Sequence, residues 1–124
     1  MKTSNVTYFK SLHVYNLRKP IGPPGSPLQY ALIITSDKFV SRPEHKIVSV
    51  LLLSDRQRND VSYIRVHIRN ITSGGAAHMA MDYYGAVDNI LPMPKSNLMV
   101  TSCKPITVFE EKDVKEKLRE WLDL

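Results

Sequence analysis

The stretch RKPIGPPGSPLQY (Arg18–Tyr30) separates two strand-like segments, and it determines how the chain is organised. Four prolines and two glycines fall within eight of its positions. Proline has no amide donor and is unsuited to the interior of a sheet, so we expect a stiff loop over Arg18–Leu28. A restricted backbone lowers the entropy cost of ordering a loop against a ligand. We therefore interpret this loop as one wall of a binding groove.

The segments on both sides of the loop have the composition of β-strands. Val6–Leu17 mixes β-branched and aromatic residues with partial alternation, which predicts a strand. Gln29–Ser36 and Lys46–Ser54 are apolar runs, each short enough for a strand that is buried on both faces. Between them, Asp37–His45 is polar and rich in turn formers, so we expect a connection there.

Val61–Ile71 (VSYIRVHIRNI) has the clearest alternation in the chain and predicts a further strand. Its apolar face would point to the core and consists of Ile64, Val66 and Ile68. Its opposite face would expose a polar set, Tyr63, Arg65, His67 and Arg69. A turn at Thr72–Gly75 (TSGG) follows. After it, Ala76–Val87 is the next candidate strand.

The last third of the chain changes its hydrophobic period. We expect a loop with two prolines over Leu91–Asn97 and a strand over Leu98–Phe109, where Pro105 indicates an edge or a bulge. Glu110–Leu124 predicts an amphipathic helix. The helical face that would pack on the sheet consists of residues at spacings of i, i+4, i+7 and i+8: Val114, Leu118, Trp121 and Leu122.

These elements predict a mainly β fold in a single domain over residues 1–124. The chain has 124 residues, which allows one domain with a real core. About six strands and one helix favour a small, strongly bent antiparallel sheet or barrel, with the helix over an open side. No run approaches the roughly 20 apolar residues of a membrane span. The single cysteine excludes an intrachain disulfide and fits a reducing, cytoplasmic location.

The charge of the chain is unevenly distributed. The formal net charge is +5, but Glu110–Leu124 carries six acidic and four basic residues, so the remainder has a net charge of +7. A basic body indicates an anionic partner such as a nucleic acid or an acidic peptide. A basic surface that serves only solubility is the alternative from charge alone.

Several kinds of chemical site are excluded by their missing motifs. The four histidines are widely spaced, so the sequence gives no metal motif, and we expect neither a metal nor a cofactor. The GPPG stretch is no phosphate loop, because proline removes the amides that a phosphate would need. The remaining candidate site is a polar, basic cluster at the end of the apolar run Lys46–Ser54. It includes Ser54, Arg56 and Arg58. Such groups suit metal-free RNA cleavage, which needs a base, a cation and an acid, although a solvated basic face is the other interpretation.

The order of these elements resembles the MazF/PemK toxin family, whose fold is an SH3-like barrel shared with the CcdB toxins. That family has a strand, a Gly/Pro-rich loop and then the pattern RPxLVISxD, which is similar to YNLRKPIGPPGSPLQYALIITSDKF here. The residues in the matching places are Leu32, Ile33, Ile34 and Asp37. GAVDNILPMPKSNLM resembles the later family segment xxxxQIRTVxKxRL.

One departure from the family pattern concerns catalysis. The catalytic arginine of the family falls at Gln29, which donates a hydrogen bond but carries no fixed charge. The family's catalytic threonine or serine falls at Ser54, to within a residue or two. The resemblance implies catalytic roles for Ser54, Gln29 and a nearby arginine, Arg56. We also expect an RNA-binding set, namely Arg18, Lys19, Arg58, Arg65, His67 and Arg69.

The resemblance implies the toxin of a type II toxin–antitoxin system, a metal-independent endoribonuclease that acts on single-stranded RNA. It further implies a homodimer and an acidic antitoxin as the partner, with no membrane involved. Two alternatives stay open. One is a protein of the same fold that binds RNA or antitoxin without cleavage, as Gln29 suggests. The other is a CcdB-like gyrase poison, because those toxins contact gyrase through a C-terminal tryptophan region and Trp121 lies near the end here.

Overall fold

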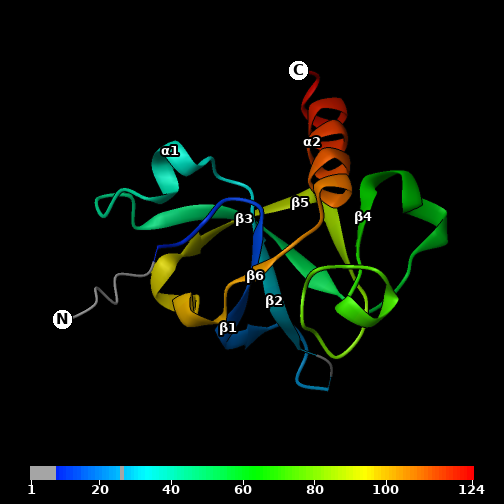
Figure 1. Ribbon diagram of the computed structural model, residues 1–124, viewed down its shortest axis with the longest axis horizontal. Coiled ribbons are helices and arrows are strands. Elements are labelled where there is room, and N and C mark those ends of the chain that lie inside the picture. Colours follow the sequence, from blue (N-terminus) through cyan, green and yellow to red (C-terminus); the bar gives the residue numbers. More distant parts are fainter. Residues whose placement is uncertain (1–7, 26) are drawn as a thin grey trace.

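A computed structural model describes residues 8–25 and 27–124 as a curled six-stranded sheet with one long helix against it (Figure 1). The strands are β1 (His13–Ile21), β2 (Leu28–Ile33), β3 (Ile47–Ser54), β4 (Arg65–Ile68), β5 (Tyr83–Pro94) and β6 (Lys104–Pro105). The α-helices are α1 (Asp37–Val40) and α2 (Val108–Leu122). The short 3-10 helices are η1 (Asn59–Ile64), η2 (Ile71–Ser73), η3 (Lys95–Asn97) and η4 (Val100–Ser102). Val6 and Thr7 of the first predicted strand, and Ser26 of the predicted loop, lie outside the described residues.

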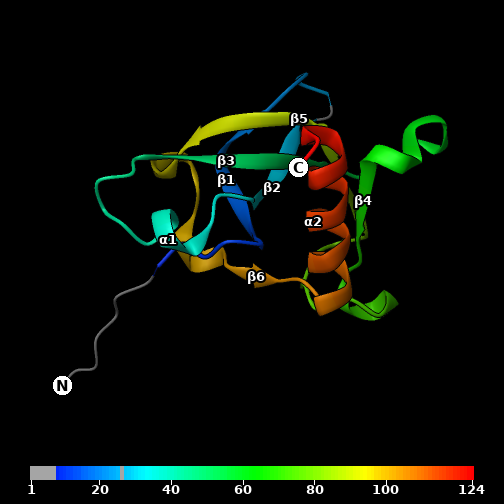
Figure 2. The same ribbon diagram turned by 90° about the horizontal axis from the view of Figure 1, so that it is seen from above.

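The sheet is antiparallel throughout, and its strand order is β4-β5-β3-β2-β1-β6. It curls into a half-barrel, with α2 standing along the side near β4 (Figures 1 and 2). The predicted mainly β fold, a small antiparallel barrel with a C-terminal helix, is therefore confirmed. Neither α-helix of the described part has the length and apolar character needed to cross a membrane.

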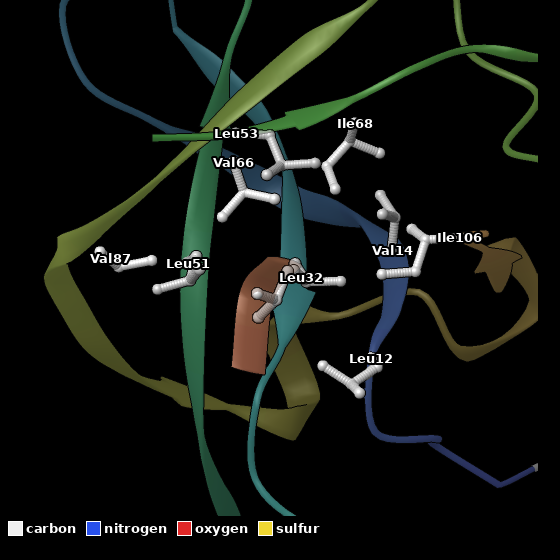
Figure 3. Packing of buried hydrophobic residues seen from close by; sticks show 10 residues of the cluster. Leu12, Val14, Leu32, Leu51, Leu53, Val66, Ile68, Val87 and Ile106 are labelled. Atoms are coloured by element: carbon white, nitrogen blue, oxygen red, sulfur yellow. The ribbon is translucent and has the colours of Figure 1, made fainter. Parts of the chain in front are cut away.

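The inner face of the sheet carries one hydrophobic core (Figure 3). Its buried side chains include Val14, Leu32, Leu51, Leu53, Val66 and Ile68. Helix α2 closes this core through the buried Val114, with Leu118 packed beside it. Thr107 caps the helix. Its hydroxyl oxygen accepts a hydrogen bond from the Glu110 amide, and the Glu110 carboxylate accepts one from the Thr107 amide.

The outer face carries a second core that loops cover. Leu52 and Val50 point outward from β3, and Val40 of α1 packs over them together with Met93 and Leu98. Both apolar runs of the sequence are therefore buried on two faces, as predicted for Gln29–Ser36 and Lys46–Ser54. These loops cover only part of the outer face. Ser54, at the end of β3, lies outside the covered part and is only half-buried.

The predicted strand Val61–Ile71 is wrong in its bounds and right in its alternation. Only Arg65–Ile68 forms a strand, and Asn59–Ile64 forms the 3-10 helix η1. Val66 and Ile68 are fully buried, as expected from the alternating pattern. The polar face is shorter than predicted, because Tyr63 belongs to η1 and Arg69 follows the strand.

The predicted loop Leu91–Asn97 is wrong over its first half, because β5 continues to Pro94. The register explains why this strand tolerates Pro92 and Pro94. Strand β4 pairs with β5 only from Tyr83 to Ala86, and beyond that β5 pairs with β3 alone. One edge of β5 is then free, so a missing amide donor costs no ladder hydrogen bond there.

The predicted strand Leu98–Phe109 is also wrong. The segment forms η4 and then the two-residue strand β6, and α2 already begins at Val108. Strand β1 runs to Ile21 and so extends into the predicted loop. Its pairing register with β2 shifts between Asn16 and Ile21. Such an irregularity accommodates Pro20, which has no amide for the ladder.

The last turn of α2 departs from the predicted packing. Leu122 and Trp121 are each 50% exposed, so neither is part of the core. Helix α2 contacts β4, β5 and η1 along its length, and its C-terminal turn extends past them (Figure 1).

Candidate functional site

Three polar side chains lie in one row across the outer face of the sheet. Ser54 of β3 is opposite Tyr84 of β5, and Tyr84 is opposite His67 of β4. Directly opposed residues of antiparallel strands point to the same face. Their neighbours Leu53 and Val66 point inward and are fully buried. The row of Ser54, Tyr84 and His67 is half-buried and lies beyond the loops that cover the rest of this face.

Gln29 lies beside this row on the next strand. Tyr30 is opposite Leu53, so the preceding residue Gln29 is level with Ser54. Gln29 is exposed and lines a small pocket of about 150 Å³ together with Asp55 and Tyr83. Burial raises the pKa of the Tyr83 phenol, and the neighbouring Tyr30 and Asp55 raise it further. The structure therefore brings Gln29 and the end of β3 together.

Arg56 is held next to Ser54 through the backbone. The Arg56 amide donates to the Ser54 hydroxyl oxygen at 3.1 Å. Its side chain is exposed, and it has no carboxylate partner within residues 8–25 and 27–124. Of the predicted catalytic residues, Arg56 thus has the positive charge that Gln29 lacks.

Other predicted RNA-binding cations are already paired with carboxylates. The Arg58 guanidinium contacts both Asp60 oxygens, at 3.0 and 2.8 Å, and this contact lowers the pKa of Asp60. Arg65 contacts Asp88 at 2.9 Å. These pairs reduce the net positive charge beside the row, which the count of basic residues in the sequence does not reveal.

His67 faces a second pocket, of about 210 Å³, at the other end of the row. Its imidazole Nε2 lies 2.7 Å from Asp82 Oδ2, and its ring packs on Tyr84 with the ring centroids 4.7 Å apart. Lys117 and Asp113 of α2 also line this pocket, and they pair with each other at 2.8 Å.

Asp82 is fixed by several donors besides His67. Its Oδ1 accepts from the Asn70 amide at 3.0 Å, from Asn70 Nδ2 at 2.8 Å and from the Ser73 hydroxyl. The Ser73 hydrogen bond, then the Asn70 amide and then His67 lower the pKa of Asp82 to about 2. Asn70 itself is buried, and its Oδ1 accepts from the Thr72 amide at 2.8 Å. Asp82 and Tyr84 were missed from the sequence: a fold is needed to bring Asp82 to His67, 15 residues away.

Arg18 and Lys19 lie apart from this row. Arg18 lines an apolar groove of about 720 Å³, with Val40, Ile47 and Leu98 among its walls. Lys19 is exposed, and its amide donates to Asn97 Oδ1 at 2.9 Å. Ile47 is the first residue of β3 and Ser54 the last, so the groove borders the opposite end of that strand. The structure therefore separates Arg18 of the predicted RNA-binding set from Ser54 of the predicted catalytic set.

Arg69 is exposed just after β4, and its amide donates to Glu110 Oε2 at 2.8 Å. Its guanidinium has no ion pair within the described ranges. In the same part of the chain, no group of three or more His, Cys, Asp and Glu side chains is placed to hold a metal ion.

Comparison with known proteins gives matches in structure. No protein-family model and no curated protein matches the chain. The toxin MazF-mt6 of Mycobacterium tuberculosis matches with a TM-score of 0.66 and 15% identity, covering 90% of this chain and 97% of that chain. The chain has the MazF-like toxin fold. An endoribonuclease in complex with its cognate antitoxin, from a mycobacterial species, matches with a TM-score of 0.60 and 18% identity over 93% of this chain and 95% of that one.

A third match with the MazF-like fold is an Mtb toxin, with a TM-score of 0.59 and 18% identity over 82% of this chain and 98% of that one. The three matches cover at least 95% of each matched chain and at least 82% of this chain, so the likeness extends over most of the fold. At this identity the likeness concerns the fold, and the chemistry depends on the residues of this chain.

Proposed function

We propose that this protein is the toxin of a type II toxin–antitoxin pair and that it cleaves single-stranded RNA without a metal ion. The observation that carries the proposal is the position of Ser54, at the open end of β3 beside Gln29 and hydrogen-bonded to the Arg56 amide. The MazF-like fold supports it, since proteins of that fold include toxins and an endoribonuclease.

In the proposed reaction the groups at the end of β3 stabilise the phosphate. As the ribose 2′-hydroxyl attacks, negative charge grows on the phosphate oxygens that are not bridging. The Ser54 hydroxyl and the Gln29 amide donate hydrogen bonds to these oxygens, and the Arg56 guanidinium supplies the fixed charge. Fixed donors and charges of this kind act without reorganising during the reaction.

The other predicted contacts divide between two surfaces. Arg58, Arg65 and His67 line the pocket next to the row, where they contact the RNA strand. Arg69 follows β4 and contacts the same strand farther along. Arg18 and Lys19 lie at or near the apolar groove, whose rim also includes Lys46. An apolar groove with a basic rim suits the acidic, partly apolar tail of an antitoxin.

We further propose a homodimer that acts in the cytoplasm, where both RNA and antitoxin are found. Large apolar side chains outside the groove, Val108 and Phe109 at the start of α2, are exposed and leave surface that a second copy can cover. Light scattering at micromolar concentration measures the mass directly. A dimer of a 14.1 kDa chain has twice that mass, and a monomer would contradict the assembly.

Two other functions each have an observation in their favour. A protein that binds without cleavage is favoured by Gln29, because the neutral amide cannot replace a catalytic arginine. A CcdB-like gyrase poison is favoured by the exposed last turn of α2, where Trp121 and Leu122 are half-exposed. If the poison is right, Trp121→Ala abolishes toxicity in cells while Ser54→Ala leaves it intact.

The proposed function is tested with purified protein, a long single-stranded RNA of mixed sequence and excess EDTA. The expected result is cleavage that EDTA does not reduce and that Ser54→Ala slows by about 100-fold or more. Ser49→Ala, in the same strand, is the matched control and is expected to cleave at the wild-type rate. Absence of cleavage by the wild type would refute the proposal in favour of the binding-only alternative.

A further inference from the structure

The hydrogen bonds around His67 differ between its two ring nitrogens. Nε2 lies 2.7 Å from Asp82 Oδ2, and Nδ1 has no hydrogen-bond partner among the described residues. With Nε2–H donating to the carboxylate, Nδ1 of the neutral ring holds a free lone pair. A histidine that is oriented by a neighbouring carboxylate is a common general base in active sites.

The carboxylate that orients His67 is itself held rigidly. Three donors from Asn70 and Ser73 fix Oδ1 of Asp82, which leaves Oδ2 for the imidazole. These bonds keep Asp82 ionised at neutral pH, since its pKa is lowered to about 2. An ionised carboxylate favours the tautomer described above and stabilises the imidazolium that forms when Nδ1 accepts a proton.

His67 and Ser54 lie on the same face, with Tyr84 between them. Two strand spacings separate their backbones, roughly 10 Å. The Tyr84 ring lies between them and packs on His67, so a ribose with its 3′-phosphate would span this distance over Tyr84, with the phosphate toward Ser54 and the 2′-hydroxyl toward His67. Tyr84 offers an aromatic ring between them, of the kind on which unpaired bases stack.

We propose that His67 is the general base of the RNA cleavage proposed above and that Asp82 is its positioning residue. This inference rests on the proposed function and assigns the proton transfer that Ser54, Gln29 and Arg56 do not perform. Nδ1 of His67 takes the proton of the 2′-hydroxyl, and the 2′-oxygen forms a bond to phosphorus. The bond from phosphorus to the 5′-oxygen breaks, and its electron pair leaves with that oxygen. A water molecule protonates the 5′-oxygen, and the imidazolium returns its proton to solvent.

The other charged side chains that line the pocket with His67 are held in ion pairs. Arg58 is paired with Asp60, Arg65 with Asp88, and Lys117 of α2 with Asp113. A general base works only in its unprotonated form, so the pH dependence of cleavage should come from the proposed base and not from these pairs. Cleavage should therefore decline on the acid side, as the base gains its proton before it meets the substrate.

The test compares cleavage rates of His67→Gln and the wild type from pH 5 to 9, with excess EDTA and a mixed-sequence RNA. Glutamine keeps an amide donor where Nε2 lies, so the contact with Asp82 is preserved while the base is lost. We expect kcat/KM to fall by about 100-fold or more, the usual contribution of a positioned base, and the acid limb to disappear. His78→Gln changes an exposed histidine and serves as the matched control, with wild-type rate and pH profile.

Two further measurements separate a base from a structural tether. Imidazole added to His67→Gly should restore part of the rate, which a tether would not allow. Asp82→Asn should lower kcat by at least about 10-fold and change the pH profile, because the orienting charge is lost. Thermal melting of each variant reports whether it is folded.

Each outcome decides one of the two proposals. Wild-type cleavage that persists in His67→Gln with an unchanged pH profile overturns this inference and leaves the proposed function standing. A wild-type rate that is flat between pH 5 and 8 overturns it without any variant. Absence of cleavage by the wild type overturns the proposed function and this inference together.

Discussion

The two faces of the sheet are built from alternating residues of the same strands, yet they are closed in different ways. On the inner face, Leu51 and Leu53 pack beneath a capped helix that is anchored by Val114. On the outer face, Leu52 packs beneath loops, and the cover ends before Ser54. Near the end of β3 the inner face is therefore core, and the outer face changes from core at Leu52 to an open polar row at Ser54.

This difference teaches where such a small fold has room for chemistry. The helix covers the open side of the half-barrel, so the inward side chains of Leu51 and Leu53 belong to the core. The loops on the other side cover only the part of the sheet near α1 and η3, which leaves polar residues at the strand ends accessible. Loss of stability and loss of activity should therefore separate between neighbouring residues.

The largest expected effect is on the inner face. Leu53→Ala should lower the free energy of unfolding by about 2–5 kcal/mol, because it opens a cavity beneath α2. Urea unfolding measures this change. A loss below about 1 kcal/mol would show that the inner core is not tightly packed at Leu53.

The neighbouring residue on the outer face gives the matched comparison. Ser54→Ala should reduce RNA cleavage by about 100-fold or more, the cost of removing one donor to the transition state. Its free energy of unfolding should change by less than about 1 kcal/mol, since Ser54 is only half-buried. Initial rates and urea unfolding on the same sample check both numbers. Equal losses of stability in Ser54→Ala and Leu53→Ala would remove the contrast between the faces.

Substitutions of Arg56 and Gln29 test which groups beside the open row stabilise the phosphate. Arg56→Ala should reduce cleavage by about 100-fold, because the row then loses its unpaired cation. Gln29→Arg should raise the rate or leave it unchanged, since it adds charge at the same place. Arg58→Ala is the control within the same loop, and we expect a smaller loss because Arg58 is already bound to Asp60. A tenfold fall in Gln29→Arg would contradict the assigned position of the phosphate.

A smaller effect is expected where the helix begins. Thr107→Ala removes the capping box and should cost about 1 kcal/mol of stability without changing the cleavage rate. Thermal unfolding together with the RNA assay tests both parts. Thr101→Ala, an exposed threonine in η4, is the control and should leave both unchanged.

The smallest effect concerns acid stability. The folded pKa of Asp82 is about 2 and lies below the value of about 3.9 expected for an unfolded chain, so its ionised form stabilises the fold above pH 4. This contribution is lost as the pH falls from about 4 to about 2, and screening by solvent limits it to roughly 1 kcal/mol. Asp82→Asn should therefore be less stable than the wild type at pH 6, and the gap should close toward pH 2. Urea unfolding at several pH values would detect a gap that stays constant, which would contradict the lowered pKa.

The sequence predicts correctly those parts of the fold in which apolar residues recur with a strong strand or helix period. The alternation around Arg65–Ile68, the apolar run that becomes β3 and the helical face at Val114 all lie where the pattern places them. Element bounds were wrong where pairing is one-sided, as at Pro94, because a free strand edge cannot be read from a single sequence. The end of α2 was wrong because the length of its neighbours, and not its own pattern, decides whether Leu122 is buried.

The site is predicted less completely than the fold, for a physical reason. Ser54 is found because it ends an apolar run, and Gln29 because the family resemblance places a catalytic arginine at that position. Asp82 has no local signal, since its partners Asn70 and Ser73 reach it only when the chain turns back between β4 and β5. The net charge of the sequence also overestimates the positive charge beside the row. Arg58 and Arg65 form ion pairs that exist only in the folded chain.

The central claim is that the open row of the outer face cleaves RNA by attack of the 2′-hydroxyl, without metal. Mass spectrometry of the products formed in excess EDTA tests this claim most directly. The account predicts fragments that end in a 2′,3′-cyclic phosphate and begin with a 5′-hydroxyl, formed about 100-fold or more slowly by Ser54→Ala and by His67→Gln. Fragments with a 5′-phosphate, or no fragments at all from the wild type, would contradict it.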